Sequence, residues 1–351
     1  MVSSVPDDDF NLAWQGSQEL QDSEDAPLFV DDIGDWHDAE GRLASDMQVA
    51  ALRIGHLDML MGLSPGQWND CVAMHVVSRL SRLLDHPTST TEIALWREMY
   101  VSATDEKARS LAWSGWAANR IAWRKPGGAT LDPSHPETLV AFLDRHSPEA
   151  GEGNRCLGRF GRSSRGVLDH VREWSTLMEH ASILSPIARA GFALHGWRSC
   201  GLAGRHPAGL FEALVVTSCL PSANGRLCEG LSFLPLSPGA VVDGSVHRRL
   251  EAFVHDVGQA ALNLRRHIEN AIAWRERAMQ LVTPKRARLA DAIQVFLDHD
   301  PVSAALVMKC SGLSRVNALR HLRRLEEAGL IRTPGHPTHE RLYTITHSAQ
   351  F

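Results

Sequence analysis

The C-terminal part of the chain carries a series of short helical patterns, each closed by a capping or breaking residue, that restricts the fold more than any other segment. Apolar residues at helical spacing predict a first helix over residues 286–299. Asp300-Pro301 ends this helix, because the residue before a proline is pushed out of the α region. Ser303 is a suitable N-cap for a short second helix, and Gly312 then provides a tight turn.

A third helix is predicted over residues 315–328, between Ser314 as its N-cap and Gly329 as its terminator. One stripe of this helix is apolar and is expected to pack on the two preceding helices; it consists of Ala318, Leu322 and Leu325. The opposite side is mostly basic and able to form hydrogen bonds, and it includes Val316, Asn317, Arg320, Arg323 and Arg324. The third helix therefore has one face for the core and one for solvent or a partner.

Two short strand patterns follow the third helix, over residues 330–332 and 341–345, and a turn-rich loop over residues 334–337 separates them. Two strands joined by a loop after such a helix make a wing. The sequence therefore predicts a winged helix-turn-helix with a small β wing over residues 284–351.

An α-helix fits the major groove of DNA, where Arg grips guanine and Asn grips adenine with two hydrogen bonds each. We expect three residues of the third helix to contact base edges: Asn317, Arg320 and Arg324. A further set is expected to contact phosphates or to act at the wing, and it comprises Ser314, Arg315, Arg323, Arg332 and Arg341.

The charge distribution favours the same C-terminal segment as the part of the chain that binds DNA. The 351 residues carry a net charge of −5, which is unusual for a chain that binds nucleic acid along its whole length. From Pro284 onward there are ten Lys or Arg against six Asp or Glu, whereas the rest of the chain has 26 against 35. The positive charge is thus concentrated in the predicted DNA-binding segment, where phosphate contacts would need it.

The upstream chain is expected to be helical and to fall into three parts. Residues 1–38 are acidic and are expected to be mobile, residues 39–245 form a helical domain, and residues 246–283 form a long connecting or dimerisation helix. The helices expected in the domain run over residues 39–63, 65–84, 91–103, 105–124, 136–146, 165–184, 186–200 and 207–219. The fold class is therefore mainly α.

The long helix has an apolar seam whose members alternate four and three residues apart: Leu250, Val254, Val257, Ala261, Leu264, Ile268 and Ala271. A seam with heptad spacing can pair with a second copy of itself, which would give a homodimer. It can equally lie against the chain's own helical domain. Both arrangements are open from the sequence.

Tryptophans are frequent in the helical domain, and Trp113, Trp116 and Trp123 lie on one expected helix. Such a stripe is usually core, so no function is assigned to it.

Patterns that signal catalysis, metal binding or secretion do not occur. The six cysteines form no Cys-x-x-Cys pair, there is no His-Glu-x-x-His, Gly-x-Ser-x-Gly or phosphate-loop motif, and the N-terminus does not resemble a signal peptide. No apolar run reaches the length that spans a bilayer. We expect a cytoplasmic protein that is not an enzyme, needs no metal or cofactor and contacts no membrane.

One near-match concerns the Fic family, whose members transfer AMP and place a winged helix after a helical domain. Residues 224–226 read Asn-Gly-Arg as in that family's motif, but the position of the catalytic base is Ser218. His206-Pro207 lies too far upstream to begin the motif. Without a base to deprotonate the attacking hydroxyl, the usual mechanism is missing.

The chain resembles an uncharacterised alphaproteobacterial family, common in rhizobial-type genomes, that joins a helical domain of unknown function to a C-terminal helix-turn-helix. The matching stretches are residues 112–120, 227–238, 246–278 and 296–332. The resemblance implies the same domain order and double-stranded DNA as partner.

The sequence thus favours a sequence-specific DNA-binding protein, a transcriptional regulator with a recognition helix over residues 315–328. Two other classes stay open. One is an enzyme or toxin-like protein with a degenerate Fic-like domain and an accessory winged helix. The other is a protein-interaction scaffold. A pocket with convergent polar groups near residues 224–226 would favour the enzyme, and a neutral or acidic outer face on the third helix would favour the scaffold.

Overall fold

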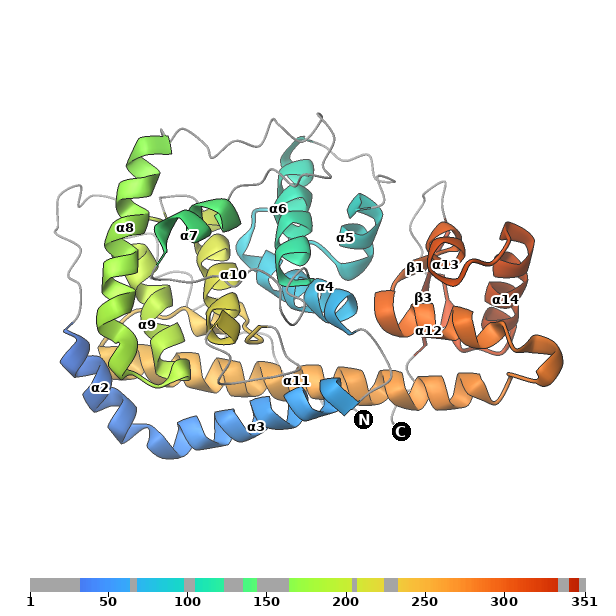
Figure 1. Ribbon diagram of the computed structural model, residues 1–351, viewed down its shortest axis with the longest axis horizontal. Helices are drawn as coiled ribbons and strands as arrows, with labels where there is room; N and C mark the ends of the chain where they lie inside the picture. The colour runs from blue at the N-terminus through green and yellow to red at the C-terminus, as the bar shows by residue number, and fades with distance from the viewer. Residues whose placement is uncertain are drawn as a thin grey trace, which may run out of the picture. The chain divides into compact units, whose positions relative to one another are not determined.

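The computed structural model describes residues 32–63, 68–97, 105–122, 135–143, 164–203, 207–223, 233–333 and 341–346. These residues are mainly helical, with one small three-stranded antiparallel sheet (Figure 1). The helices upstream of the C-terminal segment are α2 (Ile33–Arg42), α3 (Ala44–Leu63), α4 (Asn69–Leu80), α5 (Thr90–Arg97), α6 (Asp105–Ala122), α7 (Pro136–Leu143), α8 (Ser164–His180), α9 (Pro186–Ser199), α10 (Pro207–Ala223) and α11 (Val246–Met279).

The predicted first helix of the domain, over residues 39–63, is wrong in its start and in its continuity. The structure has two helices, because Asp32 accepts a hydrogen bond from the Gly34 backbone at 2.9 Å and begins α2 at Ile33. The chain then turns at Leu43, whose N–H bonds to both Ala39 and Glu40. Part of the segment expected to be mobile is therefore helical, while residues 1–31 lie outside the described ranges.

The apolar seam of α11 packs against the chain itself. All seven seam residues are at most 2 % exposed, and α11 contacts α2, α3, α9 and the 3₁₀ turn Pro238–Ala240 (Figure 1). A Cβ atom at Gly258 of α11 would lie 3.5 Å from Ala50 of α3, so these small residues let the two helices approach closely. Of the two arrangements open from the sequence, the structure shows the intramolecular one. A homodimer through residues 250–271 would require these neighbours to move away.

Tryptophan rings fill the helical core, as expected for Trp113 and Trp116. Both are less than a tenth exposed, and their rings meet edge to face at 5.8 Å. Trp36 anchors α2 in the same way against Phe192 of α9, at 5.5 Å. Trp123 lies outside the described residues. Edge-to-face geometry suits the ring quadrupoles, and the rings contribute mainly through buried area.

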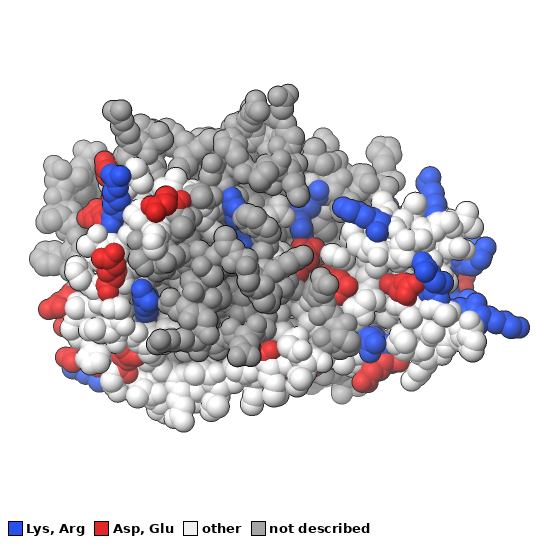
Figure 2. All heavy atoms as spheres, in the orientation of Figure 1, with Lys and Arg blue, Asp and Glu red and all other residues white. Residues whose placement is uncertain are grey.

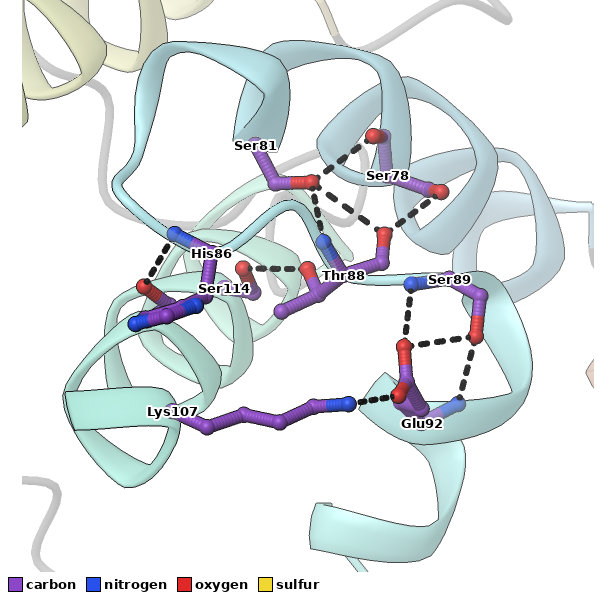
Figure 3. Close-up of polar contacts among 9 residues, drawn as sticks. Ser78, Ser81, His86, Thr88, Ser89, Glu92, Lys107 and Ser114 are labelled. Atoms are coloured by element: carbon purple, nitrogen blue, oxygen red, sulfur yellow. Dashed lines mark hydrogen bonds and ion pairs between the residues drawn. The ribbon is translucent and has the colours of Figure 1, made fainter. Parts of the chain in front are cut away.

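The corner between α4, α5 and α6 is held by side chains that complete backbone hydrogen bonds (Figure 3). The buried Ser81 hydroxyl accepts from the Thr88 N–H at 2.8 Å and lies 3.1 Å from the Thr88 carbonyl. The Thr88 hydroxyl is 2.7 Å from that of Ser114 on α6. These bonds satisfy the polar groups of a buried turn, so the corner is structural.

A reciprocal capping arrangement starts α5. The Glu92 N–H donates to the Ser89 hydroxyl at 3.2 Å, and the Ser89 N–H donates to the Glu92 carboxylate at 2.9 Å (Figure 3). This is a capping box, and Lys107 of α6 forms an ion pair with the same carboxylate. Together, the hydrogen bonds of Glu92 and its pair with Lys107 lower its pKa even though burial raises it.

Three short strands form the sheet in the order β1-β3-β2, all antiparallel. They are β1 (Val302–Ser303), β2 (Ile331–Arg332) and β3 (Leu342–Ile345), with Val302 opposite Tyr343 and Ile331 opposite Ile345. The sequence predicted β2 and β3 but missed β1, because a two-residue strand shows no alternation. Residues 334–340, where the wing loop is expected, lie outside the described ranges.

Asp300 links the helices of the C-terminal segment to the sheet. Its carboxylate accepts hydrogen bonds from the Ile345 N–H at 3.0 Å and the Thr344 hydroxyl at 3.2 Å. Burial nevertheless dominates and raises the pKa of Asp300 from 3.8 to about 7.

Because folded Asp300 keeps its proton up to about pH 7 while the unfolded chain loses it near pH 3.8, its contribution to stability falls as pH rises through this window. Asp300→Asn cannot ionise and should flatten that part of the curve. Urea unfolding of wild type and variant between pH 4 and pH 8 measures the difference. Parallel curves would contradict the assignment.

Candidate nucleic-acid interface

Helix α12 (Leu289–His299), helix α13 (Ala304–Ser311) and helix α14 (Arg315–Glu327) form the segment that the sequence singled out. Ser303 caps α13 by accepting from the Leu306 N–H at 3.0 Å, and Ser314 caps α14 by accepting from the Asn317 N–H at 3.4 Å. Gly312 ends α13 in the left-handed region at φ +64°. These predicted caps and the turn are confirmed.

Two boundaries differ from prediction. Helix α12 begins at Leu289 instead of residue 286, because Pro284–Arg286 form a separate 3₁₀ turn. Helix α14 ends at Glu327, with Ala328 as its C-cap, and Gly329 follows at φ +69°. The second difference is one residue and leaves the two faces of α14 unchanged.

The predicted apolar stripe of α14 is buried. Ala318, Leu322 and Leu325 are 0 % exposed, and α14 packs on α12 and α13. The burial fixes the rotation of α14 about its axis. Its opposite face is therefore held towards solvent.

Polar contacts join α12–α14 to the helices upstream. The Trp274 indole of α11 donates to the Leu330 carbonyl at 2.6 Å, and its ring packs on Phe296 of α12 at 5.6 Å. Asp70 of α4 bonds to Arg97 of α5 at 2.7 Å and to His299 of α12 at 3.0 Å. Burial raises the pKa of Asp70, but these two partners together outweigh it and lower the pKa.

The exposed face of α14 carries the predicted base-contact residues. Arg320 is exposed, whereas Asn317 and Arg324 are half-buried. The Arg320 guanidinium donates to the Asn317 side-chain oxygen at 3.3 Å, so the structure brings these two together. Arg324 lies one turn further along the helix, as its spacing from Arg320 requires.

The residues predicted to contact phosphate or to act at the wing divide into two groups. Arg315, Arg323 and Arg332 are exposed, and no ion pair is found for them within the described residues. Arg341 is instead held by Glu326 of α14 at 2.7 Å and by Thr333 at 3.1 Å. Its guanidinium also lies 5.4 Å from the centre of the Tyr343 ring. Arg341 thus contacts the chain itself in this structure.

The charge of the segment is far more one-sided at the surface than in the sequence. From Pro284 onward the exposed basic residues in the described ranges are Lys285, Arg286, Arg288, Lys309, Arg315, Arg320, Arg323, Arg332 and Arg341. Among those residues Glu327 is exposed and the other four acids are half-buried. Two of these four pair with exposed cations, Asp291 with Arg288 and Glu326 with Arg341. Blue side chains gather over the region labelled α14 in Figure 1 (Figure 2).

His321 responds to the resulting positive potential. Burial lowers its pKa, and the charges of Arg320, Arg324 and Arg288 lower it further, against a weaker opposing effect of Asp291. The histidine therefore favours its neutral form beside the basic face.

Two exposed apolar residues on α14 received no role from the sequence. Val316 is 66 % exposed and Leu319 is 41 % exposed, next to Asn317 and Arg320. The helical wheel places Val316 on the outer face, but only the structure shows that nothing covers it. Uncovered apolar side chains amid arginines are suited to an apolar feature of a partner, such as a thymine methyl group.

No protein-family model matches the chain, and none of the curated proteins matches it. The resemblance to an alphaproteobacterial helix-turn-helix family therefore stays a prediction. No helix within the described ranges is long and apolar enough to cross a lipid bilayer. The same residues contain no group of three or more His, Cys, Asp or Glu side chains placed to hold a metal ion.

The Fic-like stretch at residues 224–226 lies outside the described residues, as does His206. Ser218, at the position of that family's base, is fully buried and donates to the Val215 carbonyl at 2.8 Å. A hydroxyl engaged in this way bonds back to the preceding turn of its own helix.

Removing the Ser314 cap should loosen the start of α14. Ser314→Ala leaves the first-turn N–H groups without their side-chain acceptor and should lower the free energy of unfolding by about 1 kcal/mol. Ser314→Thr keeps the acceptor and serves as the control. Urea denaturation measures both, and equal stability of the Ala and wild-type proteins would refute the capping role.

Proposed function

We propose that the chain is a sequence-specific DNA-binding protein and that it regulates transcription through a winged helix-turn-helix over residues 284–351. The observation that carries the proposal is the charge asymmetry of this segment, with nine exposed cations against one exposed acid in the described residues. A surface of this kind attracts a polyphosphate backbone such as that of DNA. Binding then releases the counterions of the nucleic acid. An interaction scaffold with a neutral or acidic partner face would not need it.

The outer face of α14 supplies the reading groups. With α14 in the major groove, Arg320 grips guanine and Asn317 grips adenine, as their bidentate geometry allows. Arg324 reads a base further along, and Val316 contacts a thymine methyl. The hydrogen bond between Arg320 and Asn317 sets the two side chains beside each other before DNA arrives.

Phosphates are held by the surrounding cations. Arg315 and Arg323 flank the reading face, and Arg332 extends from β2. Ser314 acts through its cap, which orients the first turn of α14. Arg341 joins them when it leaves Glu326, so that carboxylate competes with DNA phosphate for the same guanidinium.

The helical part serves as a sensor or dimerisation body. Its support is the contact between α4 and α12, where one carboxylate bonds both Arg97 and His299. A change in the helical body can reach α12 through this contact and through Trp274.

Arg320→Ala combined with Arg324→Ala should weaken binding to a site selected from random duplex DNA. Each base contact is worth about 1–3 kcal/mol, so the pair should lose at least about 30-fold in affinity. Arg172→Ala combined with Arg266→Ala removes the same charge from exposed positions of α8 and α11 and is the matched control. Fluorescence anisotropy at fixed salt measures both, and equal losses would reduce the effect to net charge.

Glu326→Gln should free Arg341 without removing a cation. Non-specific DNA binding should tighten, and the slope of log affinity against log salt should steepen by about 1, as expected for one added phosphate contact. Glu327→Gln removes an exposed charge from the next position without releasing an arginine and controls for simple electrostatics. Identical slopes for the two variants would argue against a competing role of Glu326.

A further inference from the structure

Helix α3 has two apolar faces. The inner face carries Met47, Ala50, Ile54, Leu57 and Met61, spaced three and four apart, and all five are less than a tenth exposed. This face packs on α11. A helix that packs on one side usually presents charged residues on the other side.

The outer face of α3 does not follow that rule. Val49, Leu52, Met59 and Leu63 are 44 %, 59 %, 57 % and 78 % exposed. Ser45 and His56 complete a stripe with the spacing 4-3-4-3-4, and none of its six members is Asp, Glu, Lys or Arg. The stripe runs for roughly 27 Å along the helix.

The concentration of apolar surface on α3 sets it apart. Seven large apolar residues are exposed in the described parts of the chain, and four of them belong to this stripe. Two others lie on the proposed DNA-reading face of α14, and Ile183 stands alone. Scattered exposure of single residues needs no explanation, whereas several exposed apolar side chains along one face of a helix mark an interaction site.

Two glycines flank the stripe. At Gly55 and Gly62, seven residues apart, a Cβ atom would meet nothing within 4 Å. Small residues beside an apolar stripe leave room for another helix to approach closely. Their heptad spacing matches that of the stripe itself.

We propose that the outer stripe of α3, from Ser45 to Leu63, is a homodimer interface in which α3 packs against α3 of a second copy. A heptad-spaced stripe fits an identical stripe, since both present the same alternation of knobs and holes. The stripe offers no charge to select a basic or acidic partner, and a second copy needs none. The pairing is isologous, as in most homodimers.

The area is sufficient for such a contact. The four exposed side chains present on the order of 400–500 Å², so two copies bury roughly 800–1,000 Å² through them, and the flanking residues bring the contact to the lower limit for a specific interface. Interfaces at this end of the size range are typical of weak or transient complexes, so we expect the association to be reversible.

This interface is independent of the proposed DNA binding, although the two fit together. The seam of α11 is already filled, so α3 provides the dimer surface that the seam does not. A dimer would present two copies of α14 to two half-sites.

Sedimentation velocity tests the interface on the full chain. Wild type should show reversible association to twice the mass of one chain, and Leu52→Glu combined with Met59→Glu should weaken it at least about 100-fold. Ile183→Glu places one such charge on an isolated exposed apolar residue and should leave the dimer intact. Circular dichroism and thermal unfolding confirm that each variant is folded.

A mixing experiment distinguishes loss of the interface from misfolding of the variants. Leu52→Lys combined with Met59→Lys should also be monomeric, and mixing it with the doubly Glu-substituted chain should restore the dimer through opposite charges. A monomeric wild type would overturn the proposal, as would a dimer that survives the Glu substitutions. Wild-type monomers that bind phosphatidylcholine vesicles through the same residues would assign the stripe to a membrane and overturn it too. None of these outcomes depends on Arg320 or on DNA.

Discussion

The described fold depends on how the apolar seam of α11 is covered. This 34-residue helix has buried residues along its whole length, from Leu250 to Ala278, and α2, α3, α9 and α12 pack on it. Its N-terminal part faces α2, α3 and α9, while Trp274 near its other end holds α12 and the Leu330 backbone. One continuous helix thus joins the upstream helices to the segment that carries the basic face. The helix is unbroken from Val246 to Met279.

Polar contacts of two largely buried carboxylates, Asp256 and Asp70, reinforce that connection. Asp256 on α11 accepts from the backbone and the hydroxyl of Ser237, and burial raises its pKa above the ordinary range. Asp70 is also mostly removed from water, yet two cationic or hydrogen-bonding partners keep its pKa low. The difference lies in the partners, since Ser237 offers no charge and Arg97 does. Asp70 thus pairs directly with the Arg97 guanidinium, whereas Asp256 bonds the neutral Ser237 and has Arg79 only as a nearby charge.

Local rules made the C-terminal helices predictable. Ser303, Gly312, Ser314 and Gly329 act within one turn of their own positions, so capping and backbone preferences were enough to place them. The stripe of α14 followed from its period in the same way. The pairing of Arg341 with Glu326 joins residues fifteen apart, and which arginine remains free is decided by the tertiary structure. The choice of the α11 seam between a second copy and α3 is likewise a competition between surfaces, which a single helix pattern does not encode.

The start of α2 shows a second limit of prediction from sequence. The acidic composition of the N-terminal segment suggested mobility, but Asp32 is a cap and Trp36 inserts fully into the core. Composition describes an average over the segment, whereas α2 is held by a specific cap and by specific buried residues, Trp36 and Ala39. Missing β1 has a similar cause, because its two residues are strand only through their partners on β3.

Under the proposed function, the hydrogen bond between Asn317 and Arg320 affects how the DNA site that α14 reads would change during evolution. The amide oxygen that accepts from Arg320 is one of the groups with which Asn317 would address a base, so replacing either residue re-aims the other. The base preferences set by the two positions are then coupled. Binding sites of diverging homologues would shift at two base pairs together, and the preference at one base pair would depend on the identity of the other.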